Sequence, residues 1–191
     1  MDYEYRAVPL FMQTKKIITQ QNLGNPWFVK LDWLMSSRAN PERPWNWYSD
    51  EKEGGGVLGA LGTHAIDILH WLIGPTHSVS ALNSTSIKER KCPISGRYKR
   101  VTSEDVSISQ LQLKTISNNL IPAQLNLSAV TKESRGFSLE IYGENGTLFL
   151  SSNNQKDYVH GFSLCFTKKG EKPRNIQPDQ DCSLSKTWTD G

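Results

Sequence analysis

The sequence predicts an α+β fold: an open, mostly antiparallel sheet with helices packed on one of its faces. Both segments with helical periodicity lie in the first half of the chain. Segments of alternating apolar and polar residues then follow one another with no helix between them. Strands joined without crossover helices pair antiparallel, so two early helices would cover one face and leave the other solvated or paired.

Length and composition predict one folded domain over residues 1–191, with 37% hydrophobic and 21% charged residues. The net charge of +3 does not argue for a nucleic-acid partner. The three cysteines show no metal-ligand spacing, so we expect no metal site and a reducing, cytoplasmic environment. The longest apolar run, 57–73, is interrupted by His64, Asp67 and His70 and is shorter than the ~20 residues of a membrane span, so no membrane partner is expected.

The first elements are a helix and a strand. Pro9 suits the first turn of a helix over 9–20, and Gly24 lies just past its end. A strand over 27–35 follows, with one face formed by Trp27, Val29, Leu31 and Trp33.

A long loop over 36–56 comes next, and it contains Trp45, Trp47 and Tyr48. Structureless loops longer than about 15 residues are uncommon and tend to be functional. The loop leads into a helix over 57–73, which Gly74 and Pro75 end.

The remaining segments are predicted strands over 78–89, 105–114, 120–130, 137–142, 147–150 and 158–167. Pro122 places the third of these at an edge or at a strand start, and Asn145-Gly146 indicates a hairpin turn. Six cations lie between the first two strands, and we interpret that segment as a solvated loop rather than a phosphate-binding surface; they are Lys88, Arg90, Lys91, Arg97, Lys99 and Arg100.

Two titratable residues in the apolar helix are the first candidate site. His64 and Asp67 are three positions apart, so they project from nearly the same side of the helix, in a stripe with Ala60 and Trp71. A histidine can exchange a proton near neutral pH, and a carboxylate can orient it. The alternative is a core histidine bonded to Asp67 or to the backbone, with Asp67 anchoring the helix.

Other candidates surround this helix. Gly54, Gly55 and Gly56 either bring backbone N–H groups close to an anionic or polyhydroxylated ligand, or form a turn that sets the entry angle of the helix. Trp45 and Trp47 either stack on a sugar, or cover the sheet edge or become buried against another domain. Arg6 either clamps a ligand carboxylate or phosphate, or is a surface residue or one paired with an acid elsewhere.

Five motifs, in order, resemble the C-terminal domain of the Gfo/Idh/MocA oxidoreductases, the glucose–fructose oxidoreductase and inositol dehydrogenase family. They are Tyr5-Arg6-Ala7-Val8-Pro9, Asn22-Leu23-Gly24-Asn25-Pro26, Gly54-Gly55-Gly56 through His64-Ala65-Ile66-Asp67, Thr102-Ser103-Glu104-Asp105, and Gly143-Glu144-Asn145-Gly146-Thr147-Leu148. The resemblance covers roughly residues 5 to 150.

The resemblance implies a substrate and oligomerisation domain of a two-domain enzyme that uses NAD or NADP on a sugar, cyclitol or related small molecule. His64 would act as acid/base or hydroxyl ligand, Asp67 would support it, and Trp45, Trp47 and Arg6 would contact substrate. The dinucleotide would bind mainly to a Rossmann domain that precedes this chain, with Gly54, Gly55 and Gly56 at most assisting, so no cofactor is expected to bind tightly to the chain alone. A homo-oligomer formed through the sheet is also implied.

Two departures from the family pattern affect these expectations. Ala60 stands where many members have an aspartate that helps to bind the substrate hydroxyl, and Glu171-Lys172-Pro173 repeats the family's Rossmann-domain motif only by coincidence, in a polar loop. A non-catalytic scaffold with the same fold therefore remains an alternative. So does an unrelated sheet domain that binds carbohydrate through Trp45 and Trp47.

Overall fold

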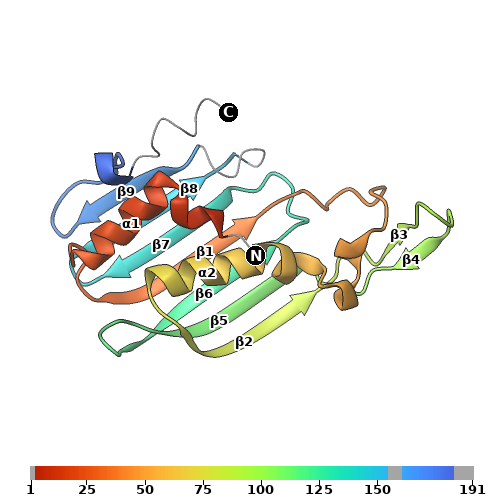
Figure 1. Cartoon of the computed structure of the whole chain (residues 1–191), viewed down its shortest axis with the longest axis horizontal. Helices are drawn as coiled ribbons and strands as arrows, with labels where there is room; N and C mark the ends of the chain where they lie inside the picture. The colour runs from red at the N-terminus through yellow and green to blue at the C-terminus, as the bar shows by residue number, and fades with distance from the viewer. Residues whose placement is uncertain (1–2, 155–160, 183–191) are drawn as a thin grey trace.

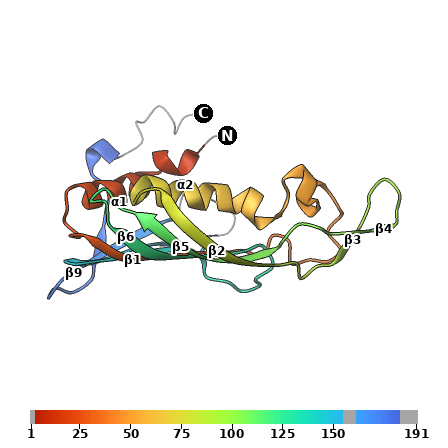
Figure 2. The same ribbon diagram turned by 90° about the horizontal axis from the view of Figure 1, so that it is seen from below.

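The computed structural model describes residues 3–154 and 161–182 of the chain. This part contains an eight-stranded sheet, two α-helices on one face of it, and a small two-stranded hairpin at one end (Figures 1 and 2). The predicted α+β class is confirmed. The elements are α1 (Pro9–Thr19), β1 (Pro26–Leu34), α2 (Thr63–Leu72), β2 (Thr76–Ser84), β3 (Glu89–Lys91), β4 (Tyr98–Arg100), β5 (Val106–Lys114), β6 (Leu120–Ser128), β7 (Gly136–Gly143), β8 (Gly146–Ser152), β9 (Ser163–Lys168) and β10 (Arg174–Ile176).

The sheet has the strand order β10-β9-β8-β7-β1-β6-β5-β2, and β1, the first strand of the chain, lies near its centre. β1 pairs parallel with β6, with Val29 opposite Ala123, and antiparallel with β7, with Val29 opposite Ile141. Every other neighbouring pair is antiparallel. The sheet is therefore mostly antiparallel, as predicted, and its one parallel pair lies at the centre.

The core lies between the sheet and the two helices. Phe11 of α1 and Ile68 and Leu69 of α2 are completely buried, and they belong to the same cluster as Val29 and Leu31 of β1. Burying one such side chain contributes about 1.5–3 kcal/mol. The alternation of buried and exposed residues along each strand places these apolar residues on the face that the helices cover (Figure 2).

The opposite face of the sheet carries exposed apolar side chains, at Leu82, Ile108, Leu120, Tyr142 and Phe149. Along their strands, all of these residues except Leu82 alternate with buried residues that face the helices. Leu82, in the exposed strand β2, is assigned to this face because it pairs with Ile108 of β5. Both helices lie on the other side of the sheet (Figure 2).

Trp27 departs from the predicted strand pattern. The pairing of β1 with β7 shifts register between Pro26 and Phe28, which marks a β-bulge at Trp27. The bulge breaks the alternation, so Trp27 is exposed while Val29 and Trp33 are buried. The predicted strand is confirmed, but Trp27 does not share the burial of the other residues assigned to its face.

The basic segment predicted as a loop contains the hairpin of β3 and β4, which projects beyond the end of the sheet (Figure 1). We call residues 88–101 the arm. Five of its six cations are exposed, but Arg90 is buried and donates hydrogen bonds to the carbonyl oxygens of Asn40, Arg43 and Arg38, at 2.7, 3.2 and 2.6 Å. The predicted strand over 78–89 ends at Ser84, because the chain leaves the sheet there to enter the arm.

Pro122 lies in an inner strand, not at an edge. It is the third residue of β6, and the ladder to β1 begins only at Ala123, so the missing N–H of Pro122 costs no bond to β1. The predicted hairpin is present, with Glu144 and Asn145 as the two residues between its strands. The first three residues of the strand predicted over 158–167 lie outside the described residues, and the observed strand is β9.

Candidate functional site

The start of α2 is shaped by a π-helical turn over Leu58–Gly62, in which the N–H of Thr63 bonds to the carbonyl oxygen of Leu58. The turn holds one residue more than an α-helical turn, and Ala60 lies within it. Small residues permit this packing, since a Cβ on Gly59 would lie 2.1 Å from the carbonyl oxygen of Gly54. His64 follows directly, as the second residue of α2.

The His64 ring lies between two tyrosines from the segment before α1. The ring centroids of Tyr3 and Tyr5 lie 5.9 and 5.7 Å from it, both edge-on. The side chain is 21% exposed, while its Nδ1 is fully buried and has no hydrogen-bond partner among the described residues. The exposed part of the ring therefore belongs to its other atoms, and Nδ1 faces Glu4, whose Oε2 is 3.8 Å away.

Asp67 bonds to Arg6. The guanidinium donates from Nε to Oδ2 at 2.9 Å and from Nη2 to Oδ1 at 2.5 Å. These hydrogen bonds raise the pKa of Arg6. Asp67 is buried while Arg6 is half exposed, so the pair ties the segment before α1 to the side of α2. Of the two interpretations of Arg6, the structure shows the pairing with an acid elsewhere in the chain.

Two of the three glycines before α2, Gly55 and Gly56, pack against the chain itself. A Cβ on Gly55 would lie 2.5–2.7 Å from three loop carbonyl oxygens, and Gly56 has φ +94°. Glu104 lies over Gly56 and accepts a hydrogen bond from the N–H of Leu58 at 2.8 Å, while its backbone oxygen accepts one from Val57. The carboxylate of Glu104 thus occupies the helix start where an anionic ligand was expected to bind.

The two loop tryptophans have different surroundings. Trp45 packs against the arm: the Nζ of Lys99 lies 3.3 Å from its ring centroid, and its Nε1 donates to the carbonyl oxygen of Arg100 at 3.2 Å. Trp47 is 52% exposed and meets Tyr48 edge-on at 5.7 Å. Trp45 therefore covers the base of the arm, and Trp47 presents the more open ring.

Tyr48, third in this aromatic run, is a core residue. The guanidinium of Arg38 lies 4.0 Å from its ring centroid, and burial raises the pKa of Tyr48 to about 12. The aromatic run thus divides into a core residue, a packing residue and one exposed ring.

Residues 102–105 connect the loop, the helix and the arm. Thr102 accepts a hydrogen bond from the N–H of Glu51, and Ser103 donates to the carbonyl oxygen of Tyr48. Asp105 accepts hydrogen bonds from the backbone N–H groups of Ser86 and Ile87. The sequence pointed to this motif only through a family resemblance. Its capping roles were missed because they depend on loops 20–50 residues away in sequence.

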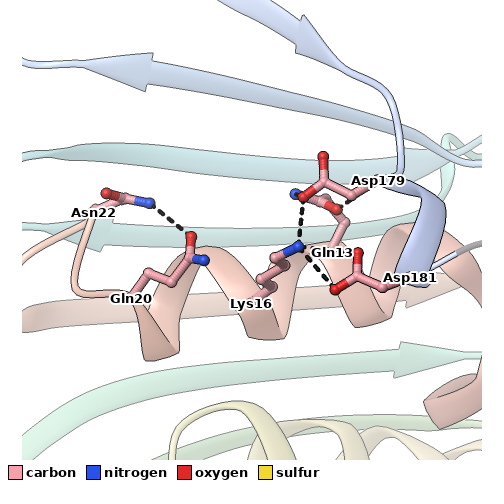
Figure 3. A network of polar contacts seen from close by, with 6 residues as sticks. All are labelled: Gln13, Lys16, Gln20, Asn22, Asp179 and Asp181. Atoms are coloured by element: carbon pink, nitrogen blue, oxygen red, sulfur yellow. Dashed lines mark hydrogen bonds and ion pairs between the residues drawn. The ribbon is translucent and has the colours of Figure 1, made fainter.

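The described cavities lie away from His64. One of them has a volume of about 680 Å³ and lies between the end of α1 and the edge formed by β9 and β10; its lining includes Gln13, Lys168, Lys169, Arg174 and Asp179. Beside it, Lys16 bonds to Asp179 and Asp181 at 2.7 and 2.9 Å, and Gln13 accepts a hydrogen bond from the N–H of Asp179 (Figure 3). This network fastens the last described turn to α1.

The described residues hold no candidate metal centre and no candidate membrane span. No three His, Cys, Asp or Glu side chains there are grouped so that they could hold a metal ion. No helix in the described ranges has both the length and the apolar character needed to cross a membrane.

Comparison with known proteins gives consistent matches. Residues 11–149 match the GFO/IDH/MocA C-terminal domain family. The chain is 42% identical, over all 191 residues, to an uncharacterized oxidoreductase of Synechocystis, of which it covers 50%. It is 26% identical to the glucose-6-phosphate 3-dehydrogenase of Bacillus subtilis, matching over 83% of this chain and 44% of that one. The chain thus spans about half the length of these relatives.

Solved structures share the fold. An NAD binding oxidoreductase from Klebsiella pneumoniae superposes with a TM-score of 0.80 at 19% identity, covering 93% of this chain and 46% of that one. Levoglucosan dehydrogenase in complex with NADH and L-sorbose gives 0.78 at 21% identity, covering 91% and 46%. The family match over most of the chain, the 42% identity over its whole length and the common fold agree: this chain belongs to the GFO/IDH/MocA oxidoreductase family, as a C-terminal domain.

Proposed function

We propose that this chain supplies the substrate-binding half of an NAD- or NADP-dependent oxidoreductase acting on a sugar, a cyclitol or a related small molecule. The observation that carries the proposal is His64, a partly exposed histidine at the start of α2 whose Nδ1 is buried while the side chain as a whole is 21% exposed. Solved relatives with this fold hold NADH with L-sorbose, and NADH with myo-inositol.

In this proposal His64 exchanges a proton with a substrate hydroxyl. General acid–base catalysis by a positioned histidine contributes typically about 10²–10⁴-fold in rate. Trp47 presents a ring on which a sugar could stack. Asp67 and Arg6 act on each other, so they hold the site together and do not contact substrate through the groups that form their pair.

The start of α2 does not fit the pyrophosphate of a dinucleotide. A pyrophosphate at a helix start bonds to free N–H groups, and here Glu104 accepts the hydrogen bond from Leu58 and places a negative charge beside Gly56. We therefore propose that the cofactor is held by a Rossmann domain encoded before this chain, and we assign it no contact with Gly54, Gly55 or Gly56. We also propose that the exposed apolar face of the sheet forms a homo-oligomer.

A second candidate function is a non-catalytic scaffold with the same fold. It is favoured by Ala60, since an alanine in the π-helical turn offers no group to a substrate hydroxyl, and by the engagement of Asp67 with Arg6. The coding sequence before Met1 distinguishes the catalytic function from the scaffold function before any activity is measured. A catalytic role predicts a strand, a Gly-x-Gly-x-x-Gly turn and a helix there.

The decisive experiment measures cofactor-dependent turnover by the full gene product. NAD and NADP are each tested with levoglucosan, L-sorbose, myo-inositol and glucose 6-phosphate. We expect turnover of at least one of them, reduced about 10²–10⁴-fold by His64→Ala. His77→Ala, which changes an exposed histidine in β2, is the matched control and should leave turnover unchanged. Turnover that survives His64→Ala intact would remove the catalytic role.

A further inference from the structure

His64 Nδ1 is a buried polar atom without a hydrogen-bond partner among the described residues. Buried donors and acceptors are nearly always paired, because leaving one unpaired costs its full desolvation penalty. The carboxylate expected to orient this ring belongs to Asp67, but both Asp67 oxygens already accept hydrogen bonds from Arg6. Because Nδ1 makes no hydrogen bond to Asp67, a group other than Asp67 is needed to pair with it.

The acidic group that faces Nδ1 is Glu4. Its Oε2 lies 3.8 Å from the nitrogen, beyond the 2.7–3.2 Å of a normal N–H···O bond. The Glu4 side chain is 46% exposed, so it is free to turn, and a movement of about 1 Å closes the gap. Hydrogen bonds at catalytic groups are often long in unliganded structures and tighten when substrate binds.

The backbone that carries Glu4 is fixed in place from both sides. Tyr5 is buried and packs on Trp33 and Phe11, at centroid distances of 5.3 and 5.6 Å. Arg6 clamps Asp67, which lies one turn along α2 from His64. The Arg6–Asp67 pair thus holds Glu4 beside the histidine. Rotation of the Glu4 side chain then brings its carboxylate within hydrogen-bonding distance of Nδ1.

We propose that Glu4 is the positioning residue of His64: its carboxylate accepts a hydrogen bond from Nδ1–H and fixes the tautomer in which Nε2 carries the free lone pair. The tautomer of a neutral histidine is set by the bond that its other nitrogen makes. A substrate hydroxyl then gives its proton to Nε2: the O–H bond breaks, an N–H bond forms, and the positive ring faces the Glu4 carboxylate. The proposal rests on the proposed function for this last step only.

The groups around the ring leave Glu4 as the anion available to it. Tyr3 and Tyr5 face it edge-on from the segment before α1, and Asp67 on the same helix is engaged with Arg6. A hydrogen bond to a charged acceptor contributes more free energy than a hydrogen bond to a neutral acceptor. That difference in free energy changes the ratio of the two neutral tautomers by about tenfold or more.

The first test uses this chain itself. Nitrogen-15 NMR of the labelled histidines measures the ratio of the two neutral tautomers of His64. We expect Glu4→Leu to lower the Nδ1–H to Nε2–H ratio about tenfold or more, and Glu4→Gln, which keeps an acceptor oxygen without the charge, to lower it less. Glu53→Leu, which alters an exposed loop glutamate, is the control and should leave the ratio unchanged. An unchanged ratio in folded Glu4→Leu would overturn the proposal.

The second test uses the full gene product. Glu4→Leu should lower kcat in the normal background and have no further effect when His64 is already alanine, because the two residues act as one unit. Equal losses of kcat in both backgrounds would overturn the positioning role. If the tautomer ratio responds but no sugar is turned over, the Glu4–His64 pair stands and the proposed function fails.

Discussion

Replacing Gly56 by alanine tests whether Glu104 caps the start of α2. Gly56 has φ +94°, and a Cβ there would lie 2.3 Å from a Glu104 carboxylate oxygen. The left-handed backbone costs about 1–2 kcal/mol for a residue with a side chain. Displacing the carboxylate loses a helix cap, which costs about another 1 kcal/mol. We therefore expect Gly56→Ala to lower the free energy of unfolding by about 2–3 kcal/mol.

Gly54→Ala is the matched control for this prediction. Gly54 has φ +72°, and a Cβ there would meet nothing within 4 Å, so alanine carries the backbone cost alone. Urea denaturation followed by circular dichroism should show Gly54→Ala less destabilised than Gly56→Ala by about 1 kcal/mol. For a chain of this length that difference corresponds to roughly 2–4 °C in Tm.

A double-mutant cycle isolates the cap. When Glu104 is already alanine, no carboxylate remains to be displaced, so Gly56→Ala should cost about as much as Gly54→Ala. The coupling energy between Gly56 and Glu104 should then be about 1 kcal/mol. Equal costs for the two glycine variants in the normal background, together with a coupling energy of zero, would refute the capping role.

Three further predictions concern parts of the chain away from α2. Cys92 should react with a thiol reagent before Cys182, because hydrogen bonds at the turn lower the pKa of Cys92 while burial raises that of Cys182; peptide mapping by mass spectrometry checks the order, and faster labelling of Cys182 would contradict it. Lys16 lowers the pKa of Asp179 in the folded protein. The stability that their ion pair contributes is therefore fully present above the pKa of an unfolded Asp, about 3.9, and is lost as the pH falls through the lower pKa of the folded state. The destabilisation by Lys16→Met should accordingly be measurable at pH 6 and disappear on acidification; a loss that does not vary with pH would exclude the ion pair as its cause. Phe11→Ala should lower the free energy of unfolding by about 3–5 kcal/mol, since this side chain is completely buried, and a loss under about 1 kcal/mol in urea denaturation would show that the core is loosely packed there.

The sequence predicted the repeating parts of the fold well. Alternation in 106–114 and helical spacing in 9–19 gave elements within one or two residues of those observed, because burial on one face imposes the period directly. The parallel pairing of β1 with β6 was not predicted, since no local pattern records which distant strand becomes a neighbour. The bulge at Trp27 was missed for a related reason: it is a property of the pairing with β7.

The candidate site was predicted in part. His64 was found from its position in an apolar helix, and the structure places it at the start of α2. Its neighbour Glu4 was missed, because a single acid before the first helix carries no pattern, and tertiary contacts, the Arg6–Asp67 pair among them, bring it to the ring. The π-helical turn at Ala60 was also missed, since its extra residue is accommodated by contacts with a loop and with β6.

The central position of β1 has a consequence for how the chain folds during synthesis. β1 is made early, but its partners in β6 and β7 lie about a hundred residues later, so this interior strand has no native neighbour until most of the chain has been translated. During that interval α1 can form locally while β1 keeps its backbone groups and apolar face unpaired. The emerging chain is therefore most exposed to misassembly before residue 143 has left the ribosome, and pairing of β1 with β6 and β7 closes the sheet.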